Sequence, residues 1–136
     1  KLGAAVNQAL TTDGSTPLLV AAEKGHAEVL GLLISGGAAV NQATTTDGST
    51  PLLAAAQNGH VEVVNLLMNG GAAVNQATTT DGSIPLFIAA LNGHTEVVGL
   101  LISGGAAVNQ AKTTDGSTPL LAAAQNGHVE VVNLLM

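Results

Sequence analysis

The sequence of 136 residues contains no cysteine, no tryptophan, no tyrosine and no arginine, and only one phenylalanine. Without cysteine the chain cannot form disulfides, cysteine-ligated zinc sites or a thiol nucleophile. Tryptophan, tyrosine and arginine supply many of the strong anchors at protein interfaces. Any binding surface on this chain must therefore rely on other side chains.

Positive charge is also scarce, since three lysines stand against nine acidic residues and give a net charge of -6. This is the wrong sign for neutralising nucleic-acid phosphates or for coating an anionic membrane. No apolar run reaches the roughly 18 residues of a membrane span, and the N-terminus lacks the basic and apolar regions of a signal peptide. We therefore expect no nucleic-acid or membrane partner, and an intracellular, cytoplasmic location.

An internal repeat organises the whole chain. An Asp-Gly pair recurs at Asp13, Asp47, Asp81 and Asp115, each time after 34 residues, and four such periods account for the full length. A hydrophobic content of 46% is enough for one core. The period predicts a single array over residues 1–136, built from the units 1–34, 35–68, 69–102 and 103–136.

Each unit has the same internal order, which the second unit illustrates. An extended segment over residues 38–43 leads into a Thr-Thr-Asp-Gly-Ser turn, and Thr50 and Pro51 then form a favourable start for a short helix. Gly59 ends that helix and His60 opens a second one with an apolar stripe. Helices this short do not persist alone in water, so each unit needs its neighbours.

The string DGSTPLLAAAQNGHVEVVNLLMNGGAAVN, residues 47–75, resembles the ankyrin repeat, and the match recurs in four registers. The resemblance implies an all-α ankyrin-repeat solenoid of stacked helix-turn-helix units with projecting β-hairpin loops. It also implies a concave face that binds partner proteins, no cofactor and no catalysis. The chain departs from the family in its period, 34 rather than 33, and the extra residue falls in the hairpin. The usual histidine after Thr-Pro-Leu is replaced by Leu19, Leu53, Phe87 and Leu121.

A His-x-Glu pair in every unit, such as His60 and Glu62, is the strongest candidate for chemistry. Residues two apart do not share a helix face, and a zinc deaminase of this signature needs ligating cysteines. We interpret the histidine as a cap of the second helix and the glutamate as a first-turn residue favoured by the helix dipole. Adjacent units lie too far apart for one metal ion to bridge them. We therefore predict no catalytic, metal-binding or cofactor-binding residue.

The four units are not equally alike. Units two and four differ only at Thr44 and Lys112, whereas units one and three differ at ten positions, of which Lys1 and Leu2 are two. Most of the other differences lie in or beside the first helix. We therefore expect units one and three to carry the specificity and units two and four to act as spacers.

In the ankyrin family, the two residues before Gly-His and those around the Asp-Gly turn are the ones that contact partners. Leu91 stands where the other units have Glu or Gln, and is either an exposed apolar anchor or part of a core repacked around Ile84, Phe87 and Ile88. The candidate partner-binding residues are Glu23, Lys24, Asp47, Ser49, Gln57, Asn58, Asp81, Ser83, Leu91, Asn92, Asp115, Gln125 and Asn126.

Two alternatives stay open at this point. The near identity of units two and four, and a start at Lys1-Leu2 where the register expects Ser-Gly or Asn-Gly, favour an engineered or truncated array with no native ligand. Met136 falls inside an apolar stripe, and solenoids need polar outer faces at their ends. We expect either that residues outside this sequence cap the array or that copies associate end to end.

Overall fold

A computed structural model describes residues 2–136. Lys1, one of the two residues that depart from the expected register at the start of the sequence, lies outside the described residues. The described part contains eight helices and no strand. Each 34-residue unit supplies two of the helices. In chain order they are α1 (Pro17–Lys24), α2 (Ala27–Ser35), α3 (Pro51–Asn58), α4 (Val61–Asn69), α5 (Pro85–Leu91), α6 (Thr95–Ser103), α7 (Pro119–Gln125) and α8 (Val129–Leu135).

The first helix of each unit begins as its sequence predicts. In α3 the hydroxyl oxygen of Thr50 accepts a hydrogen bond from the Leu53 amide at 3.2 Å, and Pro51 occupies the first helical position. Gly59 ends the helix in the left-handed region, with φ at 72°. Unit three differs, because Ile84 takes the threonine position and, although it is buried as Thr50 is, makes no side-chain capping hydrogen bond.

The second helix of each unit packs through the predicted apolar stripe. In α4 the side chains of Val63, Val64 and Leu67 are buried, and Glu62 lies in the first turn. His60 holds the N-cap position, but its side chain makes no capping hydrogen bond. The histidine therefore occupies the predicted cap position, but its ring bonds to the preceding unit instead of to its own helix.

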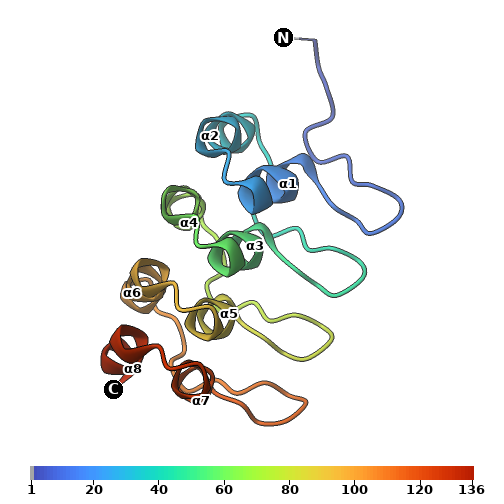
Figure 1. The fold of residues 1–136 in the computed structure, drawn as a ribbon. Coiled ribbons are helices and arrows are strands. Elements are labelled where there is room, and N and C mark those ends of the chain that lie inside the picture. Colours follow the sequence, from blue (N-terminus) through green and yellow to red (C-terminus); the bar gives the residue numbers. More distant parts are fainter. Residues whose placement is uncertain (1) are drawn as a thin grey trace.

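The helix pairs stack in a single file (Figure 1). The first helices α1, α3, α5 and α7 form an inner row, the second helices form an outer row, and each helix contacts its counterpart in the next unit. Fully buried small residues such as Ala55 and Ala56 allow the inner helices to approach closely. The predicted all-α solenoid is confirmed.

Hairpin loops project from the side of the inner row opposite the outer helices (Figure 1). In the loop of unit two the Thr44 amide donates to the Ser49 carbonyl at 2.9 Å and closes the hairpin. The neighbouring Thr45 amide donates to the Asp13 carbonyl of the preceding loop at 2.8 Å. The loops therefore have a hairpin shape, but no residue within 2–136 forms a strand.

Candidate functional site

The loops and the inner helices of units one and two enclose a pocket of about 230 Å³. Asp13, Thr46 and Asp47 reach it from the two loops, while Glu23 and Gln57 reach it from α1 and α3. Several predicted partner-binding residues, from different parts of the sequence, thus lie around one concave space.

The pocket is anionic. The pKa of Asp47 is lowered, first because the Thr44 hydroxyl donates to its Oδ1 at 2.6 Å and also because the Ser49 amide donates to the same oxygen. The pKa of Asp13 is lowered by the Ser15 amide, which donates at 2.8 Å. Both carboxylates are therefore ionised at neutral pH. Glu23 is a third acidic residue in the lining of the pocket.

The aspartates also hold their own loops together. Asp81 Oδ1 accepts from the Thr78 hydroxyl at 2.7 Å and from the Ser83 amide at 3.1 Å, and Lys112 Nζ lies 3.3 Å from Oδ2. These contacts, with the Thr78 hydroxyl first, lower the pKa of Asp81 from 3.8 to about 2. Ser83 itself is buried. Asp115 accepts from the Ser117 amide at 3.0 Å, and in its loop Lys112 takes the place of the threonine.

This difference predicts how acid affects the fold. The folded pKa of Asp81 lies below its unfolded value, so its stabilising contribution is present above about pH 4 and is lost as the pH falls towards 2. Asp81→Asn should therefore flatten the decline in melting temperature over this range. Thermal melts between neutral and acid pH measure it. Asp115→Asn, which removes no threonine bond, should flatten the decline less, and identical profiles for the two variants would contradict this account.

The asparagines before Gly-His join neighbouring units. Asn58 Nδ2 donates to the Ala54 carbonyl at 3.0 Å and to the Glu23 carbonyl of unit one at 3.3 Å. Asn92 and Asn126 make the same pair of bonds one and two units further along. These amides were predicted to contact a partner, yet they are already engaged in joining units.

The histidines of units two, three and four bond to the preceding unit beside those asparagines. His60 Nε2 lies 2.9 Å from the Glu23 carbonyl, and His94 Nε2 lies 2.9 Å from the Gln57 carbonyl. A carbonyl oxygen only accepts, so Nε2 carries the hydrogen in each case. Among residues 2–136, no three His, Asp or Glu side chains gather closely enough to hold a metal ion.

Unit three carries the most distinctive side chains. Ile84 and Phe87 are buried, as are Thr50 and Leu53 at the corresponding positions of unit two, while Leu91 is half-buried and packs against the core at the end of α5. Lys112 Nζ lies 5.3 Å from the centre of the Phe87 ring and also pairs with Asp81. The residue that distinguishes unit four from unit two therefore packs on unit three, a contact that the sequence analysis did not predict.

Comparisons with known proteins agree with this geometry. None of the helices within residues 2–136 has both the length and the apolar character that a bilayer crossing requires. No curated protein was found to match the chain. A family model described as ankyrin repeats (3 copies) matches residues 2–78 and 70–136, and the chain therefore belongs to the ankyrin-repeat family.

Proposed function

We propose that residues 1–136 act as one non-catalytic scaffold array that binds a protein partner along its concave face and loop tips. Ankyrin repeats are in general protein-interaction modules and are typically not enzymes. The observation that carries the proposal is the row formed by Glu23, Gln57, Leu91 and Gln125. This position changes from unit to unit, whereas the histidine that joins each unit to its neighbour does not change.

The chemistry of the row and of the pocket defines the partner. Asp13, Glu23 and Asp47 surround a space of about 230 Å³ and so favour a lysine or arginine side chain. Leu91, further along the groove, favours an apolar side chain. We therefore propose a partner segment with a basic residue opposite units one and two and an apolar residue opposite unit three.

A capture experiment tests this proposal. The chain is immobilised and exposed to a native lysate, alongside Glu23→Lys and Leu91→Glu. We expect the wild-type chain to retain a partner, and Glu23→Lys to weaken its binding roughly tenfold or more because the substitution brings like charges together. Leu91→Glu should weaken binding similarly, because it replaces an apolar contact with a charge. High salt should weaken the contact with the acidic pocket.

Glu62→Lys is the matched control, since it makes the same change of charge at an exposed position on the outer helix α4. It should retain the partner. Circular dichroism at increasing temperature checks that every variant stays folded. A partner that binds all three variants as tightly as the wild type does not lie on the concave face.

The alternative is an engineered or truncated array without a native ligand. The near identity of units two and four favours it. Under this alternative no lysate protein is retained in a way that depends on Glu23 or Leu91. An intracellular, cytoplasmic location remains part of the main proposal. Self-association of the chain is a separate proposal, and it uses the end faces of the array rather than the concave face.

A further inference from the structure

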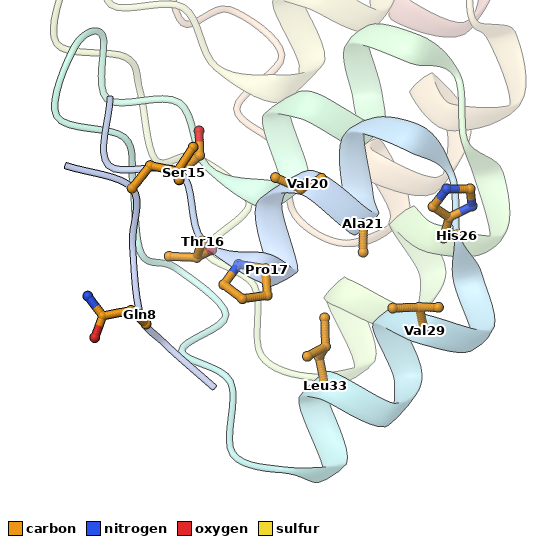
Figure 2. A pocket seen from close by; sticks show the side chains of 10 residues that line it. Gln8, Ser15, Thr16, Pro17, Val20, Ala21, His26, Val29 and Leu33 are labelled. Carbon is orange, nitrogen blue, oxygen red and sulfur yellow. The ribbon is translucent and has the colours of Figure 1, made fainter. Parts of the chain in front are cut away.

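Unit one presents an apolar hollow of about 450 Å³ (Figure 2). Pro17, Val20 and Val29 line it and are exposed. Their counterparts in unit two, residues 51, 54 and 63, are buried. The corresponding proline of the last unit, Pro119, is buried as well. The cover over this face therefore comes from the preceding unit, and unit one has none within residues 2–136.

Unit four presents the complementary face. Leu121 and Val129 are 46% and 70% exposed, whereas Leu53, the counterpart of Leu121 in unit two, is 5% exposed. The corresponding Leu19 of the first unit is also 5% exposed. This face is therefore covered by the following unit wherever one is present.

Polar groups cross every internal junction in the same pattern. Between units two and three, the Thr79 amide donates to the Asp47 carbonyl at 2.8 Å and the Ala73 amide donates to Asn41 Oδ1 at 2.8 Å. The His94 ring bonds to the Gln57 carbonyl of unit two. At the ends of the array the corresponding donors are the Thr11 amide, the Ala5 amide and the His26 ring, and the corresponding acceptors are the Asp115 carbonyl, Asn109 Oδ1 and the Gln125 carbonyl.

Two glycine positions, at which a side chain of the next unit lies against the glycine, make the match between the two end faces more specific; we call these positions glycine sockets. A Cβ atom added at Gly59 would lie 2.7 Å from the His94 ring, so the ring fits only over a glycine. At Gly127 the backbone has nearly the same φ, 71° against 72°, but no atom lies within 4 Å of that point. Gly116 is likewise open, whereas its counterpart Gly82 is covered by a threonine of the next unit. Unit four thus offers two empty sockets, and unit one offers the unused side chains of His26 and Thr11.

We propose that a second copy of this chain docks head to tail, with unit four of one copy seated on unit one of the next. Unit four has the sequence of unit two except at Lys112, so it offers nearly the surface that unit two offers to unit three. The contact would repeat most of an internal junction. Unit one departs from the other units at two places: Lys24 replaces the asparagine, so that bond is lost, and Leu2 stands where Gly70 and Gly104 lie close to the Ile34 and Met68 side chains. The face on unit one differs from the face on unit four, so a growing assembly always has one unit-one face and one unit-four face free. Assembly therefore continues beyond a dimer.

Sedimentation of the 136-residue chain over a roughly hundredfold range of concentration tests the proposal. We expect the mean mass to rise past that of a dimer. Val29→Glu blocks one face and Val129→Glu blocks the other, and each should weaken association by roughly a hundredfold because it buries an unpaired charge. Both substitutions place a carboxylate in the first turn of a helix, where the helix dipole favours it, so the fold should persist.

Mixing the two variants gives the sharper result. Each retains the face that the other has lost, so together they should form a one-to-one complex that grows no further. Asn65→Glu, at an exposed site on α4, is the control and should assemble like the wild type. A wild-type chain that stays monomeric, or variants that do not combine, would overturn the proposal and leave these faces to a further repeat or an unrelated protein.

Discussion

Leu52→Ala is expected to lower the free energy of unfolding by about 3 kcal/mol, because it removes a fully buried side chain from an inner helix and leaves a cavity. The same substitution one pair of units later, Leu120→Ala, should cost only about 1 kcal/mol. Leu120 is 38% exposed, so its removal loses fewer contacts and opens no closed cavity. Urea unfolding of both variants measures the difference.

This pair isolates burial from helix propensity. The two leucines lie in the same local sequence, Thr-Pro-Leu-Leu-Ala-Ala-Ala, so the intrinsic effect of alanine on the helix cancels. The measurements belong at concentrations where each molecule is a single chain, since association would cover Leu120. Equal losses of stability would mean that position in the stack does not determine the contribution of a leucine.

A second large effect is expected at the glycine sockets. Gly59→Ala should cost about 3 kcal/mol, of which roughly 1 kcal/mol comes from a left-handed backbone and the rest from displacing the His94 ring and its hydrogen bond. Gly127→Ala should cost only about 1 kcal/mol, because its backbone is the same but its socket is empty. Thermal and urea unfolding at low concentration compare the two.

A double-mutant cycle shows where the extra cost arises. If the His94 ring is the obstacle, His94→Ala should lose much less stability in the Gly59→Ala background than in the wild type. Additive losses would place the cost in the backbone alone and would remove the ring from the explanation.

Much of the fold is readable from the sequence because its signals are local. Thr50, Pro51 and Gly59 mark helix ends within a few residues of each other, and the repeat shows that every unit needs neighbours. The role of the histidine is not local. Its ring reaches a carbonyl 37 positions back in the chain. Because the histidine is present in every unit, its recurrence in the sequence does not distinguish a residue that caps its own helix from one that joins two units.

The candidate site was likewise predicted in part from the sequence and in part not. The family resemblance brought together Glu23, Asp47 and Gln57, which do line one pocket. It gave no indication that the asparagine amides are engaged between units or that Lys112 pairs with Asp81. The burial of a side chain such as Leu91 depends on which neighbours lie beside it in space, and the spacing within one unit does not contain that information.

The uniform junction also bears on how such a gene can change length. Each joint uses a histidine, a threonine amide and an asparagine at fixed places in a 34-residue register, whatever the groove residues are. Unequal recombination that gains or loses one whole register therefore leaves every joint with its complete set of bonds. A gain or loss of any other length would shift the register and break these bonds at a joint. The array can lengthen or shorten by inheritance in whole steps, while single substitutions in the groove alter what it binds.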